Sequence, residues 1–174
     1  MWGFDVPRDG DPVRWFKLLL LKDEDLDPDL RTSDFLIRAR KMLRENGKTA
    51  VDLLADYLRG LWGHAIETIE RARGKSVIDA MQFRVVITVP AIWKGYARQS
   101  MEAAARQAGI LDPRPGGPTG LVFANEPEAA ALCTLCEKGR KNSPGDVYVI
   151  CDAGGGTVAS LPHSYPDLWS IICK

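Results

Sequence analysis

Residues 149–161 read VICDAGGGTVASL, and this stretch decides how the whole chain is interpreted. An apolar run leads to Asp152, three glycines follow after one alanine, and Thr157 closes the group. A glycine run lets successive backbone N–H groups converge, because no side chain blocks the approach, and such groups form a concavity that suits phosphate oxygens. An acid at the carboxyl end of a strand can hold a divalent cation, directly or through its waters. The stretch therefore indicates a site for a metal ion and nucleotide phosphates.

The same residues also fit a simpler interpretation, in which the glycines only form the tight turn of a hairpin. The stretch alone favours neither interpretation. It is not a Walker loop, because no Gly-Lys-Ser/Thr follows, and it is not a dinucleotide fingerprint, because the GxGxxG spacing is absent and we expect no helix after it.

Upstream of this stretch, strand and helix patterns alternate. FRVVITV at 83–89 is β-branched and almost continuously apolar, which predicts a strand covered on both faces and ended by Pro90. The elements expected next are a helix at about 95–108, a loop at 111–120, a strand at 121–124, a helix from Pro127 to Gly139, a linker at 139–146 and a strand at 147–151. This order predicts an α/β fold.

Two helices are expected before the first strand. Ser33 is placed to cap a helix that runs to Asn46, and Thr49 with Asp52 resembles a capping box that opens a helix at about 50–73. The apolar face expected on the first helix comprises Phe35, Leu36, Ala39, Met42 and Leu43, and that on the second Val51, Leu54, Leu58, Leu61, Ala65 and Ile69. We expect residues 1–32 to be irregular, with the acidic run DEDLDPD at 23–29 as a solvated loop.

Composition excludes several classes of function. Lys plus Arg and Asp plus Glu number 23 each, so net charge gives no reason to expect a nucleic acid or an anionic membrane as partner. No apolar run approaches the roughly 20 residues of a membrane helix, and the N-terminus lacks the pattern of a signal peptide. Cys133 and Cys136 form a CxxC without a histidine cluster nearby, which argues against zinc and for a reducing compartment. We expect a cytoplasmic protein, with the nucleus left open.

Three segments, taken together, resemble the Hsp70 family. They are VVITVPAIWKGYARQSMEAAARQAGI at 85–110, LVFANEPEAAAL at 121–132 and VYVICDAGGGTV at 147–158, and their order and spacing match those of the family. The resemblance covers residues 85–158. The tryptophans and the NEPE variant look closest to the divergent Hsp70-like proteins of fungi.

The resemblance implies an actin-like ATPase fold, with two lobes around a nucleotide cleft and the sequence truncated at both ends. Residues 1–138 would be a remnant of the first lobe, with 33–73 as its helical outer subdomain and 83–138 as its mixed-sheet core. Residues 147–158 would be the phosphate-binding strand and glycine turn that start the second lobe, and 159–174 would be a tail with no counterpart in the family.

The resemblance also implies roles for individual residues. Asp152 would hold Mg²⁺ through water, and Glu126 would help to position the attacking water and the metal. Pro90 and Arg98 would relay the nucleotide state to the peptide-binding half. The residues expected beside the β- and γ-phosphates are Gly154, Gly155, Gly156 and Thr157.

The chain departs from the family pattern in ways that bear on activity. Nothing before residue 83 resembles the family's other glycine–threonine phosphate turn, and the cleft lysine has no assignable counterpart. We therefore expect a fragment of an Hsp70-like ATP-binding chaperone, with ATP or ADP and Mg²⁺ bound weakly or not at all by this chain alone, and with enzymatic activity left open. The alternatives are a non-enzymatic interaction protein that binds protein partners through 33–73, a gene-model remnant, or a protein related to sugar kinases of the same fold.

Overall fold

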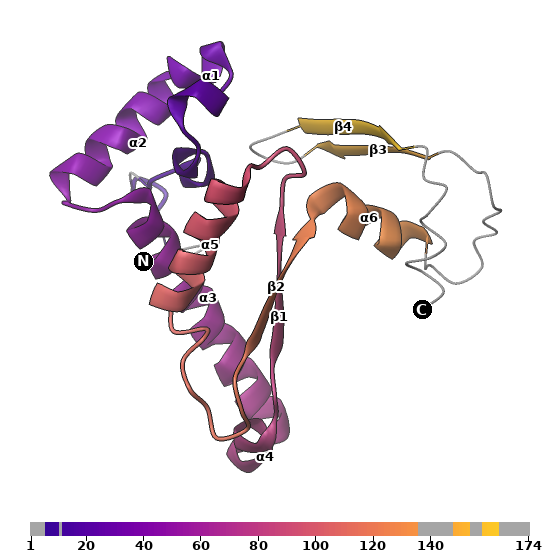
Figure 1. The fold of residues 1–174 in the computed structure, drawn as a ribbon. Helices are drawn as coiled ribbons and strands as arrows, with labels where there is room; N and C mark the ends of the chain where they lie inside the picture. The colour runs from indigo at the N-terminus through magenta and orange to yellow at the C-terminus, as the bar shows by residue number, and fades with distance from the viewer. Residues whose placement is uncertain (1–5, 11, 136–147, 154–157, 164–174) are drawn as a thin grey trace. The chain divides into compact units, whose positions relative to one another are not determined.

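The computed structural model describes residues 6–10, 12–135, 148–153 and 158–163 (Figure 1). It divides into two compact units, each of which is considered by itself. We call residues 1–85 with 94–121 the helical unit, and residues 86–93 with 122–174 the hairpin unit.

The helical unit contains both helices that the capping signals predicted. In α2 (Asp34–Glu45), the Ser33 hydroxyl accepts a hydrogen bond from the Leu36 amide, and in α3 (Ala50–Arg73) both arms of the Thr49–Asp52 capping box are present. Gly47 and Gly74 follow these helices with φ angles of 60° and 87°, a region that favours glycine. The remaining helices are η2 (Phe16–Leu20), η3 (Asp23–Asp25), α1 (Pro28–Arg31), α4 (Lys75–Ala80) and α5 (Gly95–Gln107).

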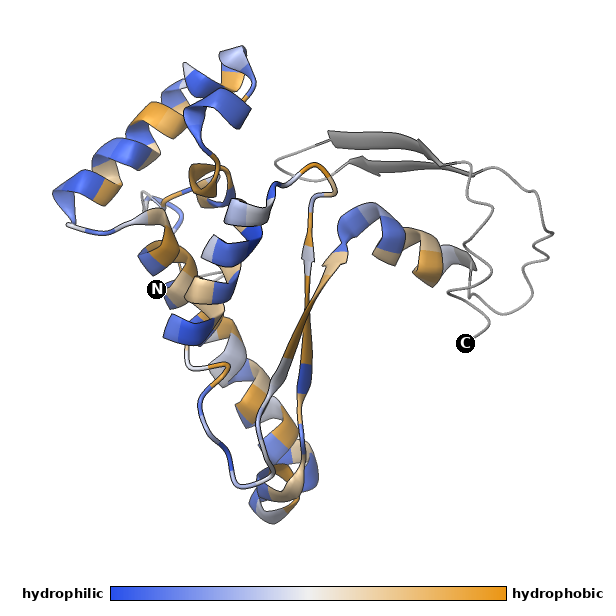
Figure 2. Ribbon diagram, viewed as in Figure 1, coloured by the Kyte–Doolittle hydropathy of each residue, from blue (hydrophilic) through white to orange (hydrophobic). Residues whose placement is uncertain are grey.

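Helices α3 and α5 pack against each other. Their buried residues combine alanines with larger apolar side chains: Leu54, Ala55 and Leu58 on α3, and Ala97, Met101, Ala104 and Ala105 on α5. A second cluster is made of Leu18, Leu26 and Leu36, with Trp15, Leu19 and Leu21 packed around it. The hydropathy colouring shows apolar residues alternating with polar ones along α2 and α3 (Figure 2).

The acidic run at 23–29 is solvated only in part: five of its residues are exposed as its composition suggested, but Asp25 and Leu26 are not, and η3 and α1 make much of it helical. Leu26 is buried in the leucine cluster, and the side chain of Asp25 is only 14% exposed. The Tyr96 hydroxyl donates to Asp25 Oδ2 at 2.6 Å, and the Lys94 ammonium donates to Oδ1. These partners lie about 70 residues away in the chain, so a local pattern could not identify them.

Two positions predicted to face the core are exposed instead. Phe35 is 62% exposed and rests against the Trp15 ring, with 6.1 Å between ring centroids, and Leu61 also lies at the surface. Only Leu36 and Ala39 are buried on α2, so its inner face is narrower than the apolar spacing implied.

Strands β1 (Arg84–Val89) and β2 (Gly120–Asn125) form a two-stranded parallel sheet, with α5 in the connection between them. The prediction that this first strand is covered on both faces is wrong for the described residues. Val85, Ile87 and Val89 are partly or fully buried, whereas Val86 and Thr88 are exposed. Burial therefore alternates along β1, as in a strand with one covered face.

The hairpin unit contains α6 (Glu126–Leu135), β3 (Tyr148–Ala153) and β4 (Val158–His163). Strands β3 and β4 are antiparallel, and the sequence had not led us to expect a strand at 158–163, because Pro162 is a poor residue for a central strand. Pro162 pairs with Val149 in a sheet of two strands, and an edge strand tolerates proline.

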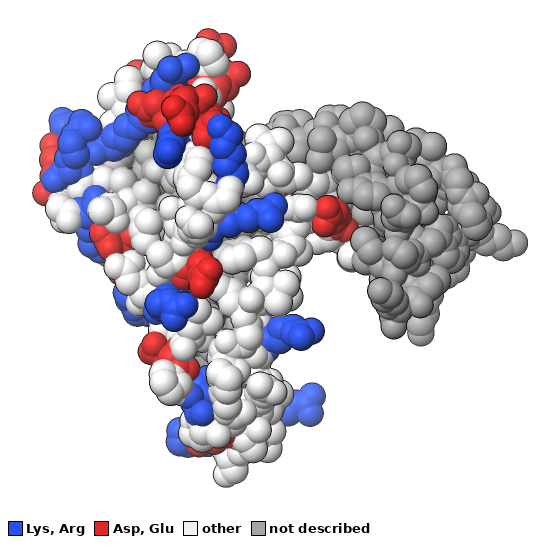
Figure 3. Space-filling view, viewed as in Figure 1, with Lys and Arg blue, Asp and Glu red and all other residues white. Residues whose placement is uncertain are grey.

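Acidic and basic side chains lie beside one another on the visible face of the described residues (Figure 3). A search of the described residues finds no helix with the length and apolar character needed to cross a bilayer.

Candidate functional site

The junction between β2 and α6 carries the first candidate residue, Glu126. The strand ends at Asn125 and the helix begins at the next residue, so this acid occupies the first helical turn. The Asn125 side-chain amide donates to Glu128 Oε1 at 2.8 Å, and Pro127 is fully buried. Proline suits the first turn, whose N–H groups have no partner within the helix, and acids there are favoured by the helix dipole. The segment that presents Glu126 thus contains a side-chain hydrogen bond between its two flanking polar residues and a buried proline ring.

Glu128 was not singled out from the sequence, although a signal for it exists. Asn125 and Glu128 stand three residues apart, which is the spacing of a capping box at a helix start. In the structure the two side chains hydrogen-bond to each other, which is not the side-chain to backbone bonding of a capping box.

The β3–β4 hairpin carries the second part of the site. Asp152 lies opposite Ala159, and the last described pair is Ala153 with Val158. Gly154, Gly155, Gly156 and Thr157 connect the two strands and lie outside the described residues. A strand and not a helix follows the glycine run, which agrees with the exclusion of Walker and dinucleotide loops. A simple hairpin turn and a phosphate-binding turn would both join two neighbouring strands. The pairing of β3 with β4 is therefore compatible with both interpretations.

The predicted site residues are divided between the hairpin unit and the helical unit. Glu126 on α6, Asp152 on β3 and Pro90 after β1 all belong to the hairpin unit, and α6 contacts β3. Pro90 is buried and accepts a hydrogen bond from the Trp93 amide at 3.1 Å, which closes the turn that ends β1. Arg98 lies half-buried on α5 in the helical unit.

The chemistry of the side chains in the hairpin unit suits a hard cation. Carboxylate oxygens are ligands for Mg²⁺, which keeps several waters and needs only one or two carboxylates from the protein. Glu126 and Asp152 supply that donor type. Within the part of the chain that the structure describes, no three His, Cys, Asp or Glu side chains converge as an all-protein metal cage would require. Cys133 is an exposed free thiol, and its CxxC partner Cys136 lies outside the described residues.

Comparison with known proteins finds chaperones. The chain is 35% identical over 118 residues to the chaperone protein HscA homolog of Laribacter hongkongensis, a match covering 68% of this chain and 16% of that protein. It is 37% identical over 124 residues to human heat shock 70 kDa protein 12B (69% and 17%) and 35% identical over 136 residues to human heat shock 70 kDa protein 12A (77% and 19%).

These relatives are members of the Hsp70 family, so the similarity confirms the Hsp70-like character seen in the three motifs. The chain spans less than a fifth of the length of the curated relatives it matches. No family model matches the chain, and no solved structure matches it.

Proposed function

Because the chain is similar to Hsp70-family chaperones over more than two thirds of its length, we propose that it is a segment of the ATP-binding domain of an Hsp70-like protein, with an actin-like fold. The observation that carries this proposal is the similarity itself, at 35% to 37% identity with relatives as far apart as a bacterium and human. The closer kinship with divergent fungal members stays a prediction.

In this proposal the phosphate end of Mg-ATP is held by the hairpin unit. The amides of Gly154, Gly155 and Gly156 and the hydroxyl of Thr157 would contact phosphate oxygens, and Asp152 would hold Mg²⁺ through water. Bound Mg-ATP would supply a phosphoanhydride whose cleavage needs mainly positioning and neutralisation of charge. Glu126 would orient the attacking water by accepting a hydrogen bond from it.

Two features of the fold support these assignments. Asp152 lies in β3 two residues before the glycine connection, and the contact between α6 and β3 puts the helix that begins at Glu126 beside the strand that carries Asp152. The hydrogen bond between Asn125 and Glu128 spans the residues on either side of Glu126. Pro90 and Arg98 are proposed to relay the nucleotide state, as in the family.

We expect the affinity of this chain alone to be low, because the sequence contains one glycine–threonine turn of this type whereas the family uses two. Phosphate oxygens held from one side remain largely hydrated, and each missing charge-assisted hydrogen bond lowers affinity.

Calorimetric titration of Mg-ATP into the full chain tests the proposal. We expect saturable binding with a dissociation constant on the order of 1 mM, or about −4 kcal/mol. Asp152→Ala should weaken binding at least about tenfold, and Glu126→Ala should weaken it less, because the glutamate acts on the water and not on the phosphates. Glu67→Ala, an exposed acid on α3, serves as the matched control. Absence of binding at millimolar nucleotide, or binding that Asp152→Ala leaves unchanged, would reject nucleotide binding by this chain.

A second candidate function is a protein-interaction role for residues 33–73. The observation that favours it is the pair Tyr57 and Leu61, which are exposed one helical turn apart on α3. A protein partner whose binding survives both Asp152→Ala and Glu126→Ala but is lost in Leu61→Asp would support this role.

A further inference from the structure

One edge of strand β1 has no strand beside it in the part of the chain that the structure describes. Strands β1 and β2 form a sheet of two strands, so β1 is paired on one side only. A strand at the edge of a sheet presents a row of N–H and C=O groups that serve as a template for a further strand. We call the side of β1 that faces away from β2 the free edge, and the chemistry of this edge specifies an extended chain as its partner.

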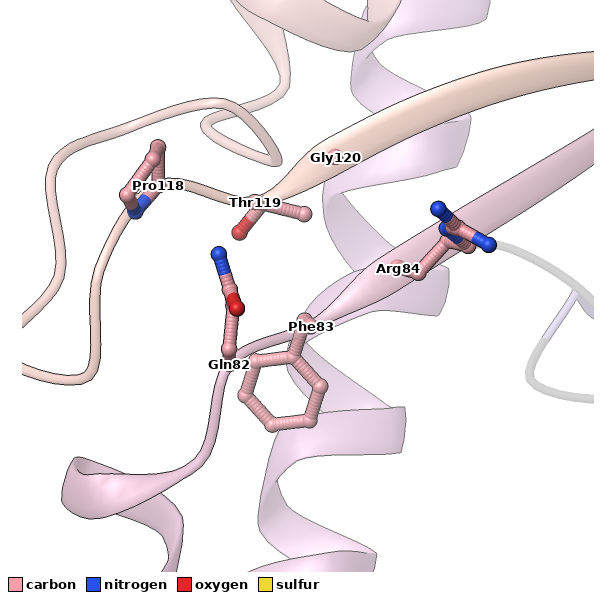
Figure 4. A pocket seen from close by; sticks show the side chains of 6 residues that line it. All are labelled: Gln82, Phe83, Arg84, Pro118, Thr119 and Gly120. Carbon is pink, nitrogen blue, oxygen red and sulfur yellow. The ribbon is translucent and has the colours of Figure 1, made fainter.

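One hydrogen bond determines which residues point to the free edge. The Gly120 amide donates to the Phe83 carbonyl oxygen at 2.9 Å, where the two strands begin side by side (Figure 4). The backbone groups of successive residues in a strand point alternately to its two sides, so the odd-numbered residues that follow Phe83 face β2. The N–H and C=O groups of Arg84, Val86 and Thr88 therefore point to the free edge.

The side chains of the same residues lie on the open face of the sheet. Arg84 and Thr88 are exposed, and Val86 is 55% exposed. The bond from Gly120 to Phe83 sets Gly120 beside Arg84, so two residues further on Val122, which is 45% exposed, lies beside Val86 on this face. Two exposed valines thus adjoin each other, whereas parallel sheets usually have both faces covered.

The sequence of β1 favours pairing with a neutral strand. Residues 85–89 read VVITV, five β-branched residues in succession, which have a high preference for strands. Edge strands are commonly protected from pairing by lysine, proline or an inward-pointing charge, and 85–89 contains none of these. The single charge of β1 is Arg84 at its start. A second copy of the same strand meets these requirements without bringing an opposing charge.

We propose that the free edge of β1 pairs with β1 of a second copy of this chain, antiparallel and about a twofold axis at Val86. Only residues whose backbone groups point to the free edge can exchange hydrogen bonds, so Val86 lies opposite Val86 of the second copy and Arg84 opposite its Thr88. Each of these pairs exchanges both of its N–H···O bonds. The contact is the same surface on both copies, so it closes at a dimer and does not extend into a filament.

Two further consequences of this register support it. The two Arg84 side chains are kept at opposite ends of the paired strands, so no like charges face each other. The open faces of both copies lie on the same side of the joined sheet, because residues directly opposite in an antiparallel pair point to the same face. Val122 and Val86 of one copy then continue into Val86 and Val122 of the other as one apolar row.

Sedimentation equilibrium of the full chain over a range of concentrations tests the proposal. We expect a monomer–dimer equilibrium with a dissociation constant on the order of 100 µM, because a contact between two strand edges is small. Val86→Lys and Val86→Glu each place like charges opposite one another and should weaken the dimer at least about tenfold. An equal mixture of the two variants should restore it, since lysine then faces glutamate. The matched control is Val77→Lys, at a valine that is 46% exposed on α4, which should leave the dimer unchanged.

Thr88→Pro keeps the proposal testable if the charged variants do not fold. The Thr88 N–H points away from β2, so proline is compatible with the β1–β2 pairing but removes a donor from the free edge. We expect a monomer whose circular dichroism spectrum matches that of wild type. A wild-type chain that stays monomeric up to roughly 1 mM would overturn the proposal. A dimer that persists in Thr88→Pro, or folded charged variants that do not associate when mixed, would overturn it as well.

Discussion

Replacing Leu36 with alanine should destabilise the protein strongly, because this side chain joins α2 to the segment that precedes it. Leu36 is 1% exposed and packs against Leu18 and Leu26, which come from the η2 region and the acidic run. The change removes three carbon atoms, worth about 2.4 kcal/mol at roughly 0.8 kcal/mol per buried carbon. The cavity left behind adds to this cost, and the measured range for such changes is about 2–5 kcal/mol. We expect a loss of about 3 kcal/mol, a large part of the roughly 5–15 kcal/mol that holds a domain together.

Urea unfolding followed by circular dichroism measures this loss directly. The matched control is Ile37→Ala, at the next residue of the same helix but 51% exposed, for which we expect a change within about 0.5 kcal/mol. Alanine is a better helix former than either residue, so helix propensity cannot explain a loss of stability in Leu36→Ala. If Leu36→Ala cost no more than Ile37→Ala, the packing of residues 16–26 against α2 would not exist in solution.

Further predictions concern an ion pair, a cap and a loop. The hydrogen bond from Lys94 lowers the pKa of Asp25, so this group adds stability above the unfolded pKa of about 3.9 and loses it as pH falls through the lowered folded value. The melting temperature of wild type should therefore exceed that of Asp25→Asn at pH 7, and the gap should close below about pH 4; a gap constant to pH 2.5 would contradict this. Thr49→Ala removes the capping box of α3 and should cost about 1 kcal/mol in urea unfolding, whereas an unchanged midpoint would mean that the cap contributes nothing. Gly116→Ala should lower stability by at least about 1 kcal/mol, since its Cβ would meet the backbone of Met81, while Gly63→Ala should not; equal midpoints for the two would refute the close approach.

Local signals in the sequence predicted where α2, α3 and α5 lie, but neither the tertiary contacts nor the short helices η2, η3 and α1 within a segment expected to be irregular. Ser33 and the Thr49–Asp52 pair each satisfy backbone amides within four residues, so their effect is visible in the sequence, and α2 and α3 begin where they indicate. Asp25 depends on Tyr96 and Lys94, far along the chain, and composition alone made it look solvated. The six-residue helix α4 follows Gly74 without a side-chain cap, so no capping residue in the sequence predicted its start.

The candidate site shows the same contrast between features that local sequence predicts and features that depend on tertiary structure. The start of a helix at Glu126 followed from Pro127, which suits a first turn, and the strand that ends near Asp152 followed from an apolar run. The pairing of β3 with β4 could not be predicted from the sequence. A strand accepts Pro162 only at the edge of a sheet, and whether a strand lies at an edge depends on how the strands assemble.

The fully buried alanines of α3 and α5 bear on how this sequence can vary. Ala55, Ala97 and Ala104 are at most 1% exposed, so in a closely packed interior a longer side chain at any of them would displace its neighbours. Substitution at these positions is thus confined to glycine, alanine and serine, whereas the leucine cluster can exchange volume among its members. Divergence among homologous chains should accordingly be slowest at these alanines, where size rather than chemistry limits what is accepted.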